Sequence, residues 1–307
     1  MLNTASEVAK RLTEIVVNTK PSSGGSNQSF NATEFQSNII TKLINTTLNN
    51  PNLTDKEKYE TLEGIISKVT ESIFNNPNLT EDKKEELLKK GIIEPAVNAT
   101  LNNPNLTDKE ENEAVKDIII SSAEQICEIP NVNATQIIKE GIIKPTLDII
   151  KAPEDIKEKY AEVSSNALIV YKALSDYLKA STDEQKQKWV KQWKEKKQLQ
   201  NATETIKKYL GCPDPKKGTS ADQNNTNKHK NSQKACKQAI INVFECKDLN
   251  KRLCKEFSTL EDALTKADKS LPLSADEIQR ILEDIRKYLI PPGSPFKLGK
   301  ILLWLEY

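Results

Sequence analysis

Glycine, histidine and aromatic residues are scarce in this sequence, and each scarcity excludes a class of structure. Nine glycines in 307 residues are too few for the turns and phosphate-binding loops of doubly wound α/β folds. Alternating runs of aromatic and β-branched residues, which are typical of strands, are also rare. The one histidine, His229, lies in a polar segment without apolar shelter, where general acid or base chemistry is not expected. We therefore expect an all-α protein that is not an enzyme.

The sequence also lacks an excess of either charge and a long apolar run. Lys and Arg number 45 against 44 Asp and Glu, so the formal net charge of +1 does not attract nucleic acid or an anionic membrane. No stretch reaches the roughly 18 uncharged apolar residues of a membrane-spanning helix. Residues 1–19 carry charges between their apolar positions, which indicates an amphipathic helix and not a signal peptide. Secretion would then use a non-classical route.

Motifs that hold cofactors or metals are missing as well. The sequence contains no glycine-rich phosphate loop, serine elbow or His-Glu metal motif, so no cofactor is expected. Four cysteines cluster in the last third, but no two of them form the close CxxC pair of structural zinc sites, and we expect no metal. Free buried thiols are the favoured interpretation, and one or two disulfides in an oxidising compartment are the alternative, for Cys212, Cys236, Cys246 and Cys254.

The strongest positive signal is an internal repeat. The segment AsnAsnProAsnLeuThr occurs at residues 49–54, 75–80 and 102–107, and degenerate versions follow around residues 130 and 153. The prolines of these five segments recur at a nearly constant interval, and such a period marks a repeat architecture. A second landmark, a pair of isoleucines, keeps the same period at residues 39–40, 65–66, 92–93, 118–119 and 142–143.

Each repeat is expected to be one helix. Thr54, Thr80, Thr107 and Thr135 are placed as N-caps, with acidic residues in the first turn of the first three helices. Apolar residues then recur at spacings of three and four, which gathers them on one stripe. Because one helix cannot bury its own stripe, we expect successive antiparallel helices to pack together as an α-solenoid or an elongated bundle.

A proline inside every second helix leaves two interpretations open. GlyIleIleGluPro at residues 91–95 and GlyIleIleLysPro at residues 141–145 place a glycine four residues before a proline. The proline ring clashes with the carbonyl of that preceding residue. Either the helix bends there, within a hairpin of about 50 residues, or the proline divides it into two short helices.

The expected domains follow from these patterns. Residues 1–32 form an N-terminal helix and a flexible link, residues 33–181 the repeat array with a period of about 26, and residues 182–211 a Lys-rich helix. A polar linker at 212–233 precedes a smaller C-terminal helical domain at 234–307. Helices are expected there near 234–256, 258–269 and 274–290, the last two opened by capping boxes at Ser258 and Ser274.

The Lys-rich helix has a basic amphipathic pattern between residues 186 and 208. Such a pattern can lie on anionic lipid, bind nucleic acid or grip a protein partner. The alternative is a solvated helix whose tryptophans pack inward. The candidate binding residues of this segment are Lys188, Trp189, Lys191 and Trp193.

The turns of the type AsnProAsnLeuThrAspLysGlu between Ile-rich helices resemble the helical-repeat region of the rickettsial heat-stable surface cell antigen, over roughly residues 33–180. The resemblance implies a secreted host-interaction protein that binds the vinculin head through amphipathic helices. The closest stretch here is 163–180, although Asn166 stands where that pattern has Ala and Tyr177 where it has Leu. Ala167, Val170 and Leu178 stand at matching positions, and with Tyr171 and Leu174, which follow at helical spacing, they are the candidate partner-binding residues.

Together these observations predict a non-enzymatic, helical-repeat protein–protein interaction module. A bacterial effector or surface antigen that binds a host protein, such as a cytoskeletal protein, fits this description, and no small-molecule substrate is expected. The alternative is binding to a membrane surface or nucleic acid through the basic helix 186–208.

Overall fold

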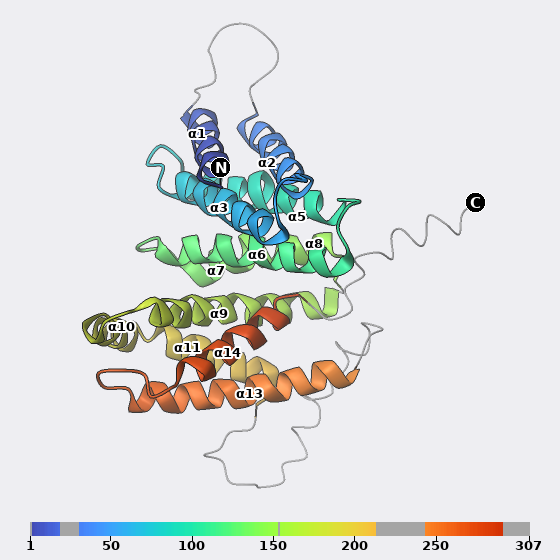
Figure 1. Ribbon diagram of the computed structural model, residues 1–307. Coiled ribbons are helices and arrows are strands. Elements are labelled where there is room, and N and C mark those ends of the chain that lie inside the picture. The colour runs from blue at the N-terminus through green and yellow to red at the C-terminus, as the bar shows by residue number, and fades with distance from the viewer. Residues whose placement is uncertain (1, 19–30, 153, 213–242, 291–307) are drawn as a thin grey trace, which may run out of the picture. The chain divides into compact units, whose positions relative to one another are not determined.

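The computed structural model describes residues 2–18, 31–152, 154–212 and 243–290 (Figure 1). All regular secondary structure in these ranges is helical, which confirms the all-α prediction. Most of the expected link and polar linker lies outside the described residues, as do His229, Cys236 and the apolar tail at 301–307.

The chain divides into two compact units, residues 1–151 and residues 152–294. The helix at 154–179, which lies within the predicted repeat array at 33–181, belongs to the second unit. The first unit therefore contains four of the five repeated segments, those at residues 49–54, 75–80, 102–107 and around residue 130.

The first unit is built from long helices joined by short turns. The helices in the first row are α1 (Leu2–Asn18), α3 (Asp55–Phe74) and α6 (Asp108–Glu128). The other row contains α2 (Ala32–Leu48), then α4 (Glu81–Glu86) with η1 (Leu87–Ile93) and α5 (Glu94–Leu101), then α7 (Ala134–Ile138) with η2 (Lys139–Ile143) and α8 (Lys144–Ile149).

Packing in this unit joins alternate helices as well as neighbours. Helix α3 packs between α1 and α6, and α5 packs between α2 and α8, as Figure 1 also shows. Chain neighbours such as α1 and α2 or α5 and α6 contact one another too. The isoleucine pairs fill the space between the rows: apart from Ile39, which is half-buried, each is at most 1% exposed, at Ile40, Ile65, Ile66, Ile92, Ile93, Ile118, Ile119, Ile142 and Ile143.

The caps explain where the helices begin. The hydroxyls of Thr54, Thr80 and Thr107 accept backbone N–H groups of the first turn, as the sequence predicts. The prediction for Thr135 is wrong, because Asn133 caps that helix and its side chain accepts from the Gln136 N–H. Asparagine is an equally good N-cap. Because the preceding turn is shorter, the helix begins two residues earlier in the sequence than predicted.

The internal prolines lie directly after π-helical segments. In η1 the Glu94 N–H bonds to the Lys89 carbonyl, and in η2 the Lys144 N–H bonds to the Lys139 carbonyl, five residues back in each case. Backbone angles remain right-handed helical on both sides of each segment. The helix therefore neither ends nor divides at the proline; a widened turn makes room for the ring.

Two repeat glycines lie where alternate helices approach closely. A Cβ atom on Gly64 of α3 would come within 2.6 Å of the Ser6 hydroxyl oxygen of α1. A Cβ atom on Gly141 of η2 would come within 2.8 Å of a Leu88 methyl carbon in η1. Neither glycine has a positive φ, so the constraint is space: at Gly141 a buried leucine leaves no room for a Cβ atom, whereas at Gly64 the close atom is a hydroxyl oxygen that can rotate.

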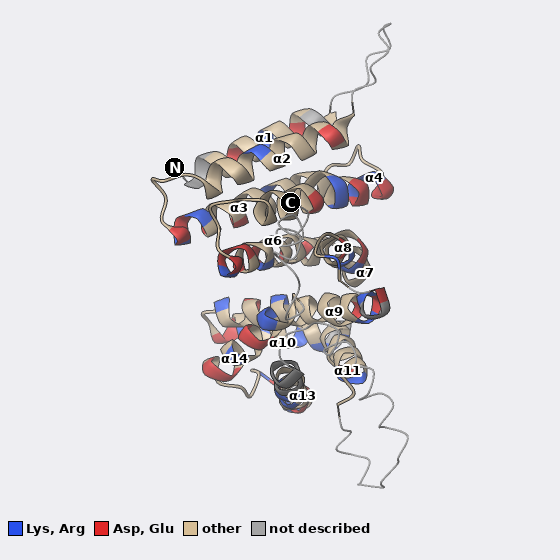
Figure 2. Ribbon diagram, turned by 90° about the vertical axis from the view of Figure 1, so that its right-hand side faces the viewer, with Lys and Arg blue, Asp and Glu red and all other residues tan. Residues whose placement is uncertain are grey.

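The second unit contains α9 (Glu154–Lys179), α10 (Asp183–Lys196), α11 (Gln198–Leu210), α13 (Val243–Lys266) and α14 (Ala275–Tyr288). Helix α11 packs against α9, α10 and α13, and α14 packs against α9 and α13. The Lys-rich helix, expected to be continuous, is interrupted at Lys197, whose φ of 51° is left-handed. Figure 2 shows the lysines and acidic residues of these helices in colour.

The expected helix start at Ser258 is wrong. Helix α13 runs through this position, and the Ser258 hydroxyl donates to the Cys254 carbonyl one turn earlier. A continuous helix aligns Leu253, Phe257 and Leu260, each at most 1% exposed, on one buried stripe, and that burial outweighs a local cap. The capping box at Ser274 and Glu277 is present as predicted.

A disulfide joins the end of α11 to the middle of α13. Cys212 and Cys254 form a disulfide bond, with their Cα atoms 5.3 Å apart. For these two cysteines the favoured interpretation, free buried thiols, is wrong, and the alternative, a disulfide, is correct. The side chain of Cys246 lies outside the described part of α13. Cys127 of α6 is half-buried.

Candidate functional site

The predicted partner-binding stripe on α9 is largely buried. Ala167 is 2% exposed, and Val170 and Leu174 are fully buried. Tyr171 and Leu178 are half-buried. In this fold the stripe stabilises the unit and offers a partner little apolar surface.

The tryptophans of the basic segment also turn inward. Trp189 is 6% exposed, and its indole N–H donates to the Ala173 carbonyl of α9 at 2.7 Å. Its ring meets Tyr177 edge-on at 4.9 Å and lies 6.1 Å from the half-buried Trp193. Lys188 and Lys191 are exposed on the opposite side of α10. The predicted segment is thus divided into a buried aromatic face and an exposed lysine face.

A cavity of about 300 Å³ lies among α10, α11 and α13. Trp189, Trp193, Leu199 and Leu264 contribute its apolar walls. The charged lining residues are Lys194 of α10, Lys197 at the junction of α10 and α11, and Glu261 of α13. The Lys194 ammonium donates to the Ala267 carbonyl, and Glu261 pairs with Lys207.

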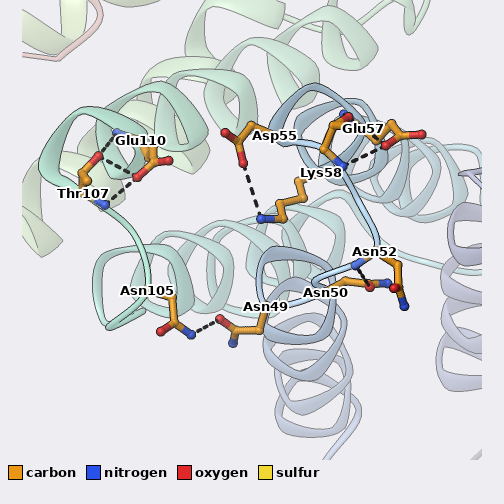
Figure 3. Close-up of polar contacts among 10 residues, drawn as sticks. Asn49, Asn50, Asn52, Asp55, Glu57, Lys58, Asn105, Thr107 and Glu110 are labelled. Carbon is orange, nitrogen blue, oxygen red and sulfur yellow. Dashed lines mark hydrogen bonds and ion pairs between the residues drawn. The ribbon is translucent and has the colours of Figure 1, made fainter.

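The repeated turns of the first unit share one hydrogen-bonding pattern. In each NPNLT turn the first asparagine accepts the N–H two residues later, at 2.8 to 3.0 Å, which closes the turn locally. Figure 3 shows two such turns side by side, where the Asn105 amide donates to the Asn49 side chain at 2.8 Å. The capping boxes Thr54–Glu57 and Thr107–Glu110 follow directly.

The capping carboxyls are held in their ionised form. Hydrogen bonds from the Thr54 backbone and hydroxyl lower the pKa of Glu57, and those from the Thr107 hydroxyl and backbone lower the pKa of Glu110. Burial of the Tyr59 ring raises its pKa to about 12, and nearby carboxylates add to this effect, with Glu110 contributing most among them. These groups serve structure, because each faces partners within its own turn or helix pair.

At the opposite end of these helices the turns leave a groove of about 710 Å³ between the α3–α4 and α6–α7 connections. Phe74 and Ile137 line it with side chains that are at most 6% exposed. A smaller hollow of about 350 Å³ lies on the other side of the α3–α4 turn. The remaining polar lining of the groove is Asn75, Glu81, Lys84, Glu85, Asn131, Asn133 and Gln136.

The groove coincides with a degenerate repeat. The α6–α7 turn reads IleProAsnValAsnAlaThr, and Asn131 in it adopts a left-handed φ of 62°. The turn therefore does not reproduce the NPNLT geometry that brings Asn105 to Asn49. The break in the repeat was the one sequence signal for a groove here, whereas the cavity beside Trp193 had no such signal because α13 is distant in sequence.

Within the described ranges, no group of three or more His, Cys, Asp or Glu side chains is placed to hold a metal ion. The helices described there include none that is long and apolar enough to cross a bilayer. Comparison of the chain with protein-family models, with curated proteins and with solved structures gave no match.

Proposed function

We propose that this protein is a non-enzymatic interaction protein whose repeat unit, an α-solenoid, binds a segment of a protein partner in the groove between the α3–α4 and α6–α7 turns. The observation that carries the proposal is the groove itself, about 710 Å³ with an apolar floor and an amide-rich rim. Repeat arrays present elongated surfaces of this kind, which suit polypeptides better than small substrates.

The chemistry of the rim favours an extended peptide. The side-chain amide of Asn75 offers both donors and an acceptor, which is what an extended backbone requires, and the amides of Asn133 and Gln136 keep further donors and lone pairs beyond the one hydrogen bond that each side chain makes within the protein. Lys84 pairs with Glu81 at 2.8 Å, so the exposed carboxylate of Glu85 leaves the rim net negative. The expected segment therefore carries a lysine or arginine.

The class of partner comes from the sequence. The resemblance to the rickettsial antigen implies a bacterial effector or surface antigen and a host cytoskeletal protein. The disulfide between Cys212 and Cys254 agrees with an oxidising, extracellular setting. Because Ala167, Val170 and Leu174 are buried, the groove and not the α9 stripe is the proposed contact.

The groove can be tested by site-directed photo-crosslinking of the full chain in host lysate. A photoreactive residue is placed at Glu85, and a control at Lys56, which is exposed at the other end of α3, about 27 Å along the helix from the groove. A protein captured reproducibly from Glu85 and not from Lys56 supports the proposal. Capture of the same proteins from both positions, or from neither, contradicts it.

Charge reversal tests the basic character of the segment. Glu85→Lys should weaken capture at least about tenfold, because a like charge then faces the partner's cation. The matched control is Glu60→Lys, which changes charge equally on the exposed side of α3. Equal loss with both variants would assign the effect to net charge.

The exposed lysine face of α10 supports a second candidate, binding to anionic lipid or nucleic acid. Lys188 and Lys191 face outward while the tryptophans beside them do not, so such binding would be electrostatic and salt-dependent. The double variant Lys188→Glu/Lys191→Glu should abolish binding to phosphatidylglycerol vesicles or to an oligonucleotide. Binding that survives this change would exclude the lysine face.

A further inference from the structure

The cavity among α10, α11 and α13 lies in the second unit, and the function proposed for the groove does not involve it. We propose that this cavity binds a medium-chain carboxylate amphiphile, an unbranched aliphatic chain that ends in a carboxylate. The inference is independent of the groove, because the two sites share no residue.

The volume sets the size of the ligand. A cavity of about 300 Å³ is at the small end of ligand pockets. If each non-hydrogen atom occupies somewhat less space than a liquid water molecule, the cavity holds on the order of ten to fifteen such atoms. Decanoate has a size in this range, whereas a two-chain phospholipid is too large.

The walls suit an aliphatic chain. Trp189 and Leu199 are at most 6% exposed and form a fixed apolar surface, because the Trp189 indole is anchored to the Ala173 carbonyl. The half-buried ring of Trp193 and the side chain of Leu264 line the cavity nearer to solvent. A chain packed between these groups leaves water without losing any hydrogen bond.

Most polar groups on the lining are already satisfied within the protein. The Thr203 hydroxyl donates to the Leu199 carbonyl at 2.8 Å, and the Thr265 hydroxyl donates to the Glu261 carbonyl at 2.9 Å. The Glu261 carboxylate is neutralised by Lys207. These groups therefore need no hydrogen bond or ion pair from a ligand.

Two residues of the cavity lining, the exposed Lys197 and the half-buried Trp193, carry an ammonium and an indole N–H that have no hydrogen-bond acceptor among the described residues. The Lys194 ammonium, which donates to the Ala267 carbonyl, adds a second positive charge and has further donors to offer. All three groups donate and none accepts, so together they select an anionic acceptor such as a carboxylate.

The backbone at Lys197 gives separate support. This residue ends α10 in a left-handed conformation, with a φ of 51°, where glycine or asparagine is the usual and less strained residue. A lysine here costs conformational energy that a role for its ammonium would explain.

The test is calorimetric titration of the full, oxidised chain with monomeric decanoate and with decanol, which has the same chain length without the charge. Decanoate should bind saturably, about tenfold or more tightly than decanol, because the ionic hydrogen bonds are lost with the alcohol. Equal affinities would overturn the proposal, since the cavity would then be only an apolar pocket.

Variants separate the head-group contact from the fold. Lys197→Asn removes the ammonium at a position where asparagine tolerates the left-handed backbone, and it should weaken decanoate but not decanol binding. Trp193→Ala should weaken both ligands, and Lys188→Gln on the exposed face of α10 should change neither. Circular dichroism and the thermal midpoint establish that each variant is folded.

Three further results would contradict the inference: no saturable heat with decanoate, an unchanged decanoate affinity in Lys197→Asn, or loss of binding in Lys188→Gln. Vesicles of phosphatidylglycerol distinguish a membrane from a free amphiphile. Binding to the vesicles without binding to monomeric decanoate would assign the lysines to a lipid surface and exclude the cavity.

Discussion

The side-chain amide of Asn105 donates to the side-chain oxygen of Asn49, 56 residues earlier in the sequence, at 2.8 Å and so joins two of the repeated turns. The two residues occupy the turns after α2 and after α5, which belong to the same row of helices. A repeat in the sequence thus becomes a contact in space, because equivalent turns are brought side by side.

Asn105→Ala should therefore lower the free energy of unfolding by about 0.5 to 1 kcal/mol, the usual contribution of an exposed hydrogen bond. The matched control is Asn52→Ala, since Asn52 occupies the same position in the preceding NPNLT turn of this edge, and no cross-turn hydrogen bond of its side chain is described. Urea denaturation measures both. Equal losses would mean that the bond between the turns does not stabilise the unit.

Substitution of the two close-contact glycines should have opposite effects. Gly→Ala in a helix gains about 1 kcal/mol of helix propensity. At Gly64 the new methyl meets only the Ser6 hydroxyl, which can rotate, so Gly64→Ala should be neutral or stabilising. At Gly141 it meets fully buried Leu88, and overpacking should destabilise the protein by about 1 to 2 kcal/mol net. Thermal midpoints in which Gly64→Ala is the more damaging variant would contradict this contact geometry.

Removal of the disulfide should destabilise the second unit specifically. Cys212 and Cys254 are 42 residues apart, and the chain-entropy relation gives about 4 kcal/mol for a loop of this length. The double variant Cys212→Ala/Cys254→Ala is followed through the fluorescence of Trp189 and Trp193, with Trp304→Phe in all variants.

The control for the disulfide is Cys127→Ala in the first unit. It should leave the tryptophan transition in place, whereas a reducing agent should reproduce the effect of the double variant. A transition that is insensitive to both the reducing agent and the double variant would mean that α11 and α13 do not depend on the covalent link.

Acid should weaken the capping boxes at Glu57, Glu110 and Glu277. Hydrogen bonds from the cap residues lower the pKa of each carboxyl below its ordinary value of 4.5. The folded state therefore favours the ionised form, so the stabilising contribution is present above pH 4.5 and is lost as the pH falls through the lowered pKa.

The triple variant Glu57→Gln/Glu110→Gln/Glu277→Gln keeps the shape of the capping boxes but cannot titrate. Denaturation midpoints of the two proteins should differ at about pH 7 and converge towards about pH 3. A constant difference over this range would show that the ionised carboxylates contribute nothing to folding.

The sequence predicted the first unit well because its signals are local. A cap such as Thr54 and a stripe such as Leu62 and Ile66 act within one helix, and their repetition at a nearly constant interval shows that the same element recurs. The choice between bending and splitting at Pro95 could not be made from the sequence, because a π-helical turn depends on how the helix packs against its neighbours.

The predictions for the second unit failed where distant segments decide the outcome. Ser258 looks like a cap until the burial of Phe257 is known. The stripe on α9 looks available for a partner until α11 and α14 are seen to cover that helix. One wall of the cavity beside Trp193 comes from residues 261–267, at and directly after the end of α13, far along the chain from Trp193, and no local sequence pattern indicates that these segments meet.

The widened turns before Pro95 also account for the uneven repeat length. The step from the cap Thr80 to the cap Thr107 is one residue longer than the step from Thr54 to Thr80. The intervening turns have equal lengths, so the additional residue falls inside the helix that contains η1. In a regular α-helix one inserted residue would rotate everything beyond it by about 100° and expose the isoleucines. Because the inserted residue is accommodated as a π bulge, the following turn keeps its place beside the neighbouring turn. Arrays of this kind can therefore change in length by a single residue.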